Sequence, residues 1–252
     1  MAESFIQLER LSKSFKQKQV LDGISLDIRR GESICIIGLS GSGKSVMLKH
    51  LMRLMDPDEG RILVDGQDIA ELEGEDLVAM RRRFGMLFQG AALLDSMTVA
   101  DNVGLGLTES RKYTDEQIEE IVISKLEMVG MVDSAEKLPS ELSGGMRKRV
   151  GLARAIATDP EVMLYDEPTS GLDPVTSDVI DDLIVELNQK LHVTSVTVTH
   201  DMRSAFKIAD RIVMLYGGHI EFDGSPEQIR NNTNPVVQQF IAGSARGPIR
   251  VA

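Results

Sequence analysis

A glycine-rich segment from Gly38 to Ser45 combines small residues with a lysine and a hydroxyl group. It follows a continuously apolar run and precedes a helical pattern, which is the context that a G-x-x-x-x-G-K-S phosphate-binding loop requires. Backbone N–H groups of such a turn surround an anion, and the positive end of the following helix adds to the attraction. We expect Lys44 to reach the β- and γ-phosphates of a nucleotide and the Ser45 hydroxyl to bind Mg²⁺. The alternative is a plain glycine turn, which the Lys-Ser pair at these positions disfavours.

Two adjacent carboxylates, Asp166 and Glu167, follow a second apolar run at 162–165. A buried strand delivers such groups to its carboxyl end, which is where ligands bind in open α/β sheets. Asp166 would hold Mg²⁺, directly or through water, and Glu167 would act as the general base on an attacking water. Taken alone, this segment would be better interpreted as two solvated acids at the end of a strand. Beside a phosphate-binding loop, the catalytic interpretation is favoured.

A second glycine turn, Leu142-Ser143-Gly144-Gly145-Met146, precedes the helical pattern at 147–158. A glycine turn at a helix N-terminus is a phosphate site, yet this one has no lysine and the chain already has a phosphate loop. One explanation is that it closes over a nucleotide held by a second copy of the chain. The alternative is simple capping of the helix by Ser143.

The elements that must position these residues are indicated by hydrophobic periodicity, with a period of two for strands and 3.6 for helices. The expected strands are 6–11, 24–28, 33–38, 61–64, 162–165, 193–199, 212–215 and 219–222. The expected helices are 44–55 and 179–191, and residues 72–158 read as mostly helical segments joined by polar loops. Turns are expected at Asp65-Gly66 and Gly217-Gly218. The pattern predicts one α/β domain with a helical insertion and no internal repeat.

Composition argues against several classes of function. The chain has 252 residues and a net charge of −11, from 39 acidic and 28 basic side chains. Nucleic acid is a poor partner for such a chain, because phosphate backbones require clustered Lys and Arg. Cys35 is the single cysteine, so no intramolecular disulfide is possible and we expect a reducing compartment. It lies in an apolar run, so we also expect its thiol to be buried. The N-terminus lacks the pattern of a signal peptide, and no apolar run approaches the roughly 18 residues of a membrane span.

Two basic runs, 81–83 and 147–149, could indicate nucleic acid or lipid headgroups. A solvated helix face is the favoured interpretation of each run, because charges on one side of a helix usually face water.

Together these motifs resemble the ATP-binding subunits of ABC transporters, over essentially the whole chain from Phe5 to Gly243. The resemblance implies an α/β P-loop NTPase fold: a RecA-like core with an antiparallel β subdomain, plus an inserted α-helical subdomain at roughly 90–158 that carries the signature motif. Residues 5–242 would form this single ATPase domain. Residues 243–252, rich in small residues, would be a flexible tail unless something holds them.

The resemblance also implies the roles of site residues. Gln89 matches the Q-loop, which contacts Mg²⁺ and links to a membrane subunit, and His200 matches the switch histidine that contacts the γ-phosphate. Phe15 takes the place of an aromatic ring stacked on adenine. The implied catalytic residues are Lys44, Gln89, Glu167 and His200, and the implied Mg²⁺ ligands are Ser45, Gln89 and Asp166. The implied ATP-binding residues are Phe15, Gly38, Ser40, Gly41, Ser42, Gly43, Lys44, Ser45, Val46, Ser143, Gly144, Gly145 and Asp173.

The same resemblance implies a homodimer. Two copies would face head to tail and enclose two ATP molecules, each between one phosphate loop and the other copy's signature motif. The pair would drive an integral membrane permease, and the chain would lie as a peripheral protein at the cytoplasmic face of the inner membrane. The apolar segment 90–94 would line the groove for a permease helix or, equally, form core of the helical subdomain.

The stretches 142–156 and 164–174 look like those of the Mla/Mce-type phospholipid transporters. Met146 with its following basic run fits neither the Gln-rich segment of solute importers nor the Glu of lipopolysaccharide exporters. The resemblance implies phospholipid trafficking between inner and outer membrane for outer-membrane lipid asymmetry, with an Mce-type lipid-binding protein and a STAS-domain protein as further partners. The alternative is an importer of a small solute such as an amino acid. A non-transport ABC ATPase would show fused halves, a coiled-coil insertion or a basic face, which this sequence lacks.

Overall fold

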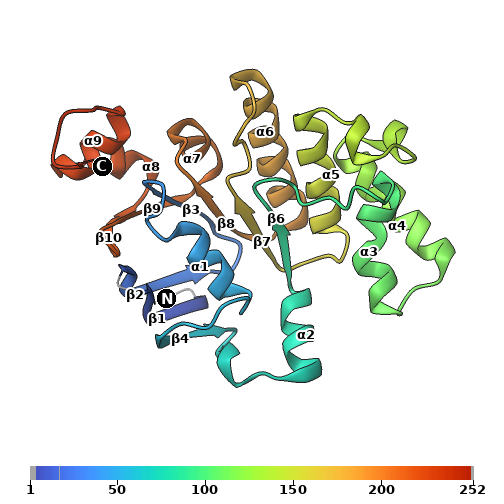
Figure 1. Cartoon of the computed structure of the whole chain (residues 1–252), viewed down its shortest axis with the longest axis horizontal. Coiled ribbons are helices and arrows are strands. Elements are labelled where there is room, and N and C mark those ends of the chain that lie inside the picture. Colours follow the sequence, from blue (N-terminus) through green and yellow to red (C-terminus); the bar gives the residue numbers. More distant parts are fainter. Residues whose placement is uncertain (1–3, 17, 251–252) are drawn as a thin grey trace. The chain divides into compact units, whose positions relative to one another are not determined.

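The computed structural model describes residues 4–16 and 18–250, whose helices and strands are labelled in Figure 1. These residues form two compact units. Unit 1 comprises the described residues up to Leu77 together with those from Val196 onward. Unit 2 comprises Val78–Ser195. Within the part of the chain that the structure describes, no helix has the length and apolar character needed to cross a membrane.

The first sheet of unit 1 is antiparallel and has the strand order β2-β1-β4-β5. Its strands are β1 (Ser4–Phe15), β2 (Lys18–Arg29), β4 (Glu59–Val64) and β5 (Gln67–Asp68). Asp65 and Gly66 join β4 to β5 with φ angles of 56° and 77°, the pair of positive values that a type I′ hairpin needs. The antiparallel subdomain and this turn are therefore confirmed.

The second sheet of unit 1 contains the strand that leads into the phosphate loop. Strand β3 (Ser33–Gly38) pairs in parallel with β9 (Arg211–Tyr216), which pairs in antiparallel fashion with β10 (His219–Gly224). The residues of β8 (Thr194–Thr199) that belong to unit 1 lie next to β3 in the strand order. The helices of this unit are α1 (Lys44–Leu51), α7 (Met202–Ile208), α8 (Pro226–Arg230) and α9 (Pro235–Ala242), with a 3₁₀ turn at Ile69–Glu71.

Helix α1 is shorter than predicted: it ends at Leu51, whereas the sequence pattern continues to Met55. Arg53 adopts a left-handed conformation, with φ 48°. The N–H of Arg53 donates to the carbonyl of His50 and that of Leu54 to the carbonyl of Lys49, which is the Schellman pattern of a helix C-terminus. The apolar residues beyond Leu51 kept the helical period, so periodicity alone did not reveal this stop.

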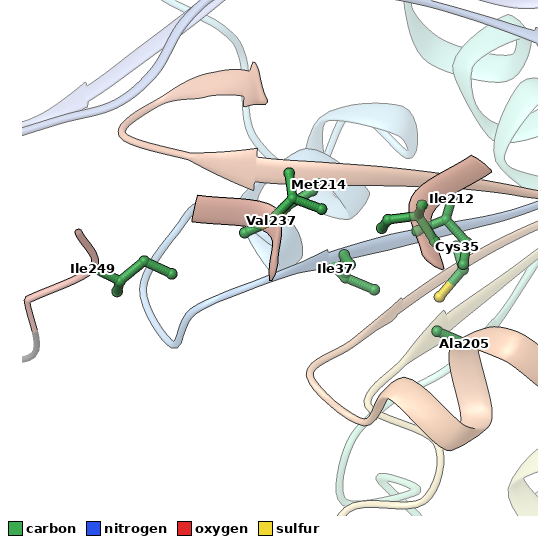
Figure 2. Close-up of a cluster of buried hydrophobic side chains, with 8 residues drawn as sticks. Cys35, Ile37, Ala205, Ile212, Met214, Val237 and Ile249 are labelled. Carbon is green, nitrogen blue, oxygen red and sulfur yellow. The ribbon is translucent and has the colours of Figure 1, made fainter. Parts of the chain in front are cut away.

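A buried cluster of apolar side chains joins β3 and β9 to the C-terminal segments of unit 1 (Figure 2). Its members come from strands, helices and the chain end: Cys35, Ile37, Ala205, Ile212, Met214, Ile229, Val237 and Ile249. Cys35 has no solvent exposure, which confirms the expected buried thiol.

The C-terminal tail is held by this cluster as far as it is described, to Arg250, and residues 251–252 lie outside the described residues. Ile249 is only 6% exposed, and its backbone N–H donates to the side-chain oxygen of Gln239 at 2.7 Å. The side-chain nitrogen of Gln239 donates to the carbonyls of Ser244 and Ile249, both at 3.1 Å. From the sequence, the tail was expected to be flexible unless other residues fixed it. The hydrogen bonds of Gln239 are such contacts.

Unit 2 is built mainly from helices, together with a parallel pair of strands (Figure 1). Its helices are α3 (Val99–Ser110), α4 (Asp115–Met128), α5 (Gly144–Ile156) and α6 (Pro174–Leu191), with 3₁₀ turns at Val132–Ser134 and Pro139–Glu141. Helix α2 (Gly74–Arg82) spans the boundary between the units. The two paired strands of unit 2 are β6 (Phe84–Leu87) and β7 (Val162–Asp166). Strand β6 was missed by the sequence pattern, because four residues including a glycine are too few to show a period of two.

Gly85 explains how β6 packs so closely on α5. A Cβ atom at this position would lie 2.2 Å from the carbonyl oxygen of Ala155 and 2.6 Å from the sulfur of Met163. Because backbone cannot yield as a flexible side chain does, Gly85→Ala is expected to lower the free energy of unfolding by about 2–3 kcal/mol. Urea unfolding followed by circular dichroism measures this change. Gly90→Ala is the matched control, since a Cβ there meets no atom within 4 Å, and equal stability of the two variants would contradict the prediction.

Candidate nucleotide site

The loop after β3 adopts a backbone that only glycine enters easily. Gly38, Gly41 and Gly43 have φ angles of 152°, 76° and 100°. A Cβ at Gly38 would lie 2.5 Å from the carbonyl oxygen of Leu215 on the neighbouring strand β9. The glycines thus serve the turn, which the sequence motif predicted, and also the close packing of the loop on β9, which it did not. Ser40 is exposed on this loop, whereas Ser42 is half-buried.

Lys44 lies at the start of α1 and is only 7% exposed. Its ammonium group donates to the carbonyl of Gly38 at 2.8 Å and to that of Leu39 at 3.1 Å, so the side chain folds back over the loop. Within the described chain no side chain caps α1, whose N-cap is Gly43. The N-terminal amides of this helix and the cationic Lys44 therefore face one small region, which suits an anion. Ser45 and Val46 follow in the first turn and are half-buried.

Phe15 and His200 are the other predicted site residues of unit 1. Phe15 ends β1 and is 41% exposed, so its ring is accessible for stacking. The Lys13 ammonium lies 5.9 Å from the ring centroid. His200 is exposed directly after the last residue of β8. Asp201 then caps α7 by accepting a hydrogen bond from the N–H of Arg203 at 2.8 Å, which fixes where the strand-to-helix loop ends.

In unit 2 the structure brings Gln89 and the two carboxylates to one edge of the parallel strand pair. Leu87 of β6 is paired with Tyr165 of β7, so the two strands end at the same level. The Gln89 amide nitrogen donates to the hydroxyl of Ser170 at 3.2 Å. Glu167 has a left-handed φ of 47°, which is uncommon for a residue with a Cβ, and its carbonyl accepts the N–H of Ser170 at 3.1 Å.

Lys148 of α5 is the functional candidate that sequence reasoning missed. The run 147–149 was predicted to be a solvated helix face, which is wrong for Lys148 because this residue is only 4% exposed. Its ammonium group donates to the carbonyl of Gln89 and, at 3.2 Å, to that of Glu167. Burial lowers the pKa of Lys148 to about 8, while Asp166 and Glu167 act in the opposite direction. Arg147 is exposed, as predicted for that position.

The signature turn begins α5. The Ser143 hydroxyl accepts the N–H of Met146 at 3.3 Å, so the capping role considered from the sequence is present. A Cβ at Gly145 would lie 2.7 Å from a methyl carbon of Thr176, and one at Gly144 would lie 3.2 Å from Leu172. These glycines therefore let the turn pack against the start of α6. A cavity of about 410 Å³ opens beside the turn and is lined in part by Ser143, Gly145 and Arg149.

Asp173 caps α6 by accepting the N–H groups of Val175 and Thr176, both at 3.0 Å. The Thr176 hydroxyl also donates to the other carboxylate oxygen at 2.5 Å. The hydrogen bond from the Thr176 hydroxyl, together with the hydrogen bonds from backbone N–H groups, lowers the pKa of Asp173 below its usual value. A negative charge at the helix N-terminus is thereby stabilised.

The predicted residues thus form two groups, one in each unit. Unit 1 contributes the phosphate loop, Phe15 and His200. Unit 2 brings together Gln89 and Glu167 through Lys148 and Ser170. The signature turn stands at the first residues of the helix that carries Lys148.

Known proteins share this chain's sequence and fold. The family model described as ABC transporter matches residues 21–170. The probable ribonucleotide transport ATP-binding protein mkl of Mycobacterium leprae is 42% identical over 244 residues, which cover 97% of this chain and 70% of that protein. The intermembrane phospholipid transport system ATP-binding protein MlaF of Haemophilus influenzae is 38% identical over 250 residues, which cover 99% of this chain and 95% of that protein.

A solved structure is also similar: the dimeric ATP-binding cassette MJ0796 in a post-hydrolysis state bound to ADP and phosphate. It aligns with a TM-score of 0.80 at 33% identity, over 87% of this chain and 98% of the cassette. The P-loop NTPase fold of the ABC type is therefore confirmed. Because the family model spans more than half of the chain and the phosphate loop has the geometry the motif predicts, the protein belongs to the ABC transporter family, as an ATP-binding subunit with ATPase activity.

Proposed function

We propose that this chain powers the trafficking of phospholipid between an inner and an outer membrane, in support of outer-membrane lipid asymmetry. The observation that carries the proposal is the end-to-end similarity to the intermembrane phospholipid transport protein MlaF, over 99% of this chain and 95% of that relative. An ATPase subunit drives transport without forming the path of the cargo, so the cargo is inferred from whole-length similarity rather than from the site.

Import of a small solute is the second candidate. The relative named for ribonucleotide transport supports a small solute as the cargo, with a slightly higher identity of 42%. That relative extends beyond the aligned part, because only 70% of its length is covered. The phospholipid candidate is preferred because its alignment covers 95% of the relative MlaF as well as 99% of this chain.

The proposed working form is a homodimer in which two copies lie head to tail around two ATP molecules. The similarity to a solved dimeric cassette supports it. The dimer would act on an integral membrane permease as a peripheral protein at the cytoplasmic face of the inner membrane. An Mce-type lipid-binding protein and a STAS-domain protein are the further partners that the phospholipid proposal implies. Residues 5–242 would act as one ATPase domain, with residues of roughly 90–158 as its helical subdomain.

We assign ATP binding to the phosphate loop, with Lys44 at the β- and γ-phosphates and Phe15 stacked on adenine. The buried ammonium group of Lys44 and the uncapped start of α1 support this assignment. The signature turn, Ser143 to Gly145, would contact the nucleotide of the partner copy, and Asp173 would stabilise the adjoining turn. His200 would contact the γ-phosphate from its exposed position after β8.

The residues proposed for Mg²⁺ fit a hard cation. Ser45, Gln89 and Asp166 offer hydroxyl, amide and carboxylate oxygens, which Mg²⁺ prefers. The amide nitrogen of Gln89 donates to Ser170, so its oxygen is the atom that would bind the metal. Mg²⁺ sites of this kind use few protein ligands, and phosphates and water would complete the coordination. When bound, Mg²⁺ would neutralise charge on the phosphates.

Hydrolysis would then proceed by attack of a water oxygen on the γ-phosphorus as the bond to the ADP oxygen breaks. Glu167 would accept the proton of that water, since it directly follows β7 and lies next to Asp166 in the sequence. Lys44, His200 and the partner's signature turn would stabilise the charge that develops on the γ-phosphate oxygens. ADP and inorganic phosphate leave as products.

Purification of the chain with its complex from native membranes in mild detergent tests the cargo. We expect a permease, an Mce-type protein and enriched phospholipid in the purified complex, identified by mass spectrometry of proteins and lipids. An unrelated membrane protein, purified from the same membranes in the same detergent, gives the background level of adventitious lipid. A permease with a solute-binding protein and background lipid would reject the phospholipid proposal and leave the ATPase assignment intact.

A further inference from the structure

One ammonium group connects three segments of unit 2 that lie far apart in sequence. Lys148 belongs to α5, and its Nζ donates to the carbonyls of Gln89 and Glu167. The first carbonyl lies in the loop after β6, and the second lies in the turn after β7. Burial of an ammonium group is costly unless its hydrogens find acceptors, so these two bonds account for a lysine that is only 4% exposed.

We infer that Lys148 is a positioning residue, which fixes the Gln89 loop and the Glu167 turn to the helix that begins with the signature motif. This inference rests on the proposed function of Gln89 and Glu167. Lys148 acts through their backbones and is not assigned any contact with the nucleotide.

The two carbonyls belong to turns that need an external anchor. Glu167 has its left-handed φ of 47°, a conformation that surrounding contacts must maintain in a residue with a side chain. In the other loop, Ala91 and Ala92 have φ angles of 60° and 49°, so this loop is also held away from the commonest backbone conformations. A cationic donor is suited to both places, because hydrogen bonds from charged groups are stronger than neutral ones.

A second cation on the same helix supports the inference. The Arg154 guanidinium donates to the carbonyl of Ala92 at 2.7 Å and to that of Ala91 at 2.6 Å. Helix α5 therefore holds three carbonyls in or near the Gln89 loop with two basic side chains. A displacement of the signature turn at the start of this helix would be transmitted both to the Gln89 loop and to the carbonyl of Glu167.

The test compares Lys148→Met, which removes all donors, with Lys148→Gln, which keeps two N–H donors without charge. The matched control is Lys125→Met, since Lys125 is also buried in unit 2, at 9% exposed, but pairs with Asp159 instead. Steady-state ATP hydrolysis gives kcat and KM for the full-length chain. Hydrogen exchange without nucleotide follows the N–H groups of Ala91 and Ser170, which close the two turns onto Phe88 and Glu167.

We expect Lys148→Met to lower kcat by at least about tenfold, the scale of losing a hydrogen bond from a charged group, while KM for ATP changes less than about threefold. Lys148→Gln should recover part of this loss, and Lys125→Met should not reproduce it. Exchange at Ala91 and Ser170 should accelerate in Lys148→Met and stay unchanged in the control.

The inference would be overturned by a kcat in Lys148→Met within about twofold of the wild type, or by losses of equal size in Lys125→Met. Unchanged exchange at Ala91 and Ser170 would overturn it as well. A wild-type chain that hydrolyses no ATP would count against the proposed function instead, and the exchange comparison would still decide the role of Lys148.

Discussion

Replacement of Glu167 by glutamine is expected to leave ATP bound and to lower hydrolysis by at least about a hundredfold, the usual scale for losing a general base. Glutamine has nearly the same shape but does not accept a proton from the attacking water. The backbone contacts of this residue, to Lys148 and to the N–H of Ser170, involve its carbonyl and remain available in the variant. Measured ATP affinity together with single-turnover hydrolysis separates the two effects.

The matched control is Glu120→Gln, which removes one carboxylate from an exposed position on α4. It should hydrolyse ATP at the wild-type rate. Near-normal turnover in Glu167→Gln would mean that another group takes the proton, and the assignment of the base would be abandoned.

Replacement of Lys44 by alanine is expected to weaken ATP binding itself by at least about tenfold, because hydrogen bonds from a charged group contribute roughly 1.5–3 kcal/mol. In the structure the ammonium group already lies over the loop, within 2.8 Å of the Gly38 carbonyl and 3.1 Å of the Leu39 carbonyl. The phosphates of ATP would compete with these two carbonyls for hydrogen bonds from the Lys44 ammonium group, which already lies at the loop. Isothermal titration calorimetry with ATP gives the dissociation constant of each variant.

Lys49→Ala is the control for this experiment, since it removes a lysine from an exposed position on the same helix. The control should bind ATP as the wild type does, apart from weak long-range electrostatics. An unchanged affinity in Lys44→Ala would place the phosphates elsewhere in the protein.

The sequence predicted those parts of the fold whose signals are local. The run at 33–38 became β3 with the same bounds, because continuous burial of an apolar strand next to a glycine motif leaves few other interpretations. The phosphate loop was predicted for the same reason, since its glycines are needed for positive φ angles that the structure contains. The strands at β9 and β10 were anticipated with their Gly217-Gly218 turn, for which φ is 59° and 86°.

Features set by distant contacts escaped prediction. Lys148 stands between two arginines and looks like one charge among several on a helix face, yet carbonyls 59 and 19 residues away bury it. Strand β6 is defined by its pairing with β7 rather than by its own four residues. The start of α6 at Pro174 rather than near Val179 follows from the cap supplied by Asp173, a residue for which the family resemblance implies only nucleotide binding.

The single cysteine has a practical consequence for biophysical work. Cys35 of β3 is fully buried in the apolar cluster of unit 1, so its thiol is shielded from alkylating reagents. A cysteine introduced at Leu54 in unit 1, which is 50% exposed, or at Val132 in unit 2, which is 36% exposed, would react selectively with a maleimide dye. Donor and acceptor dyes at both positions would report by resonance energy transfer any change in the separation of the two units during ATP turnover, without first mutating the native thiol.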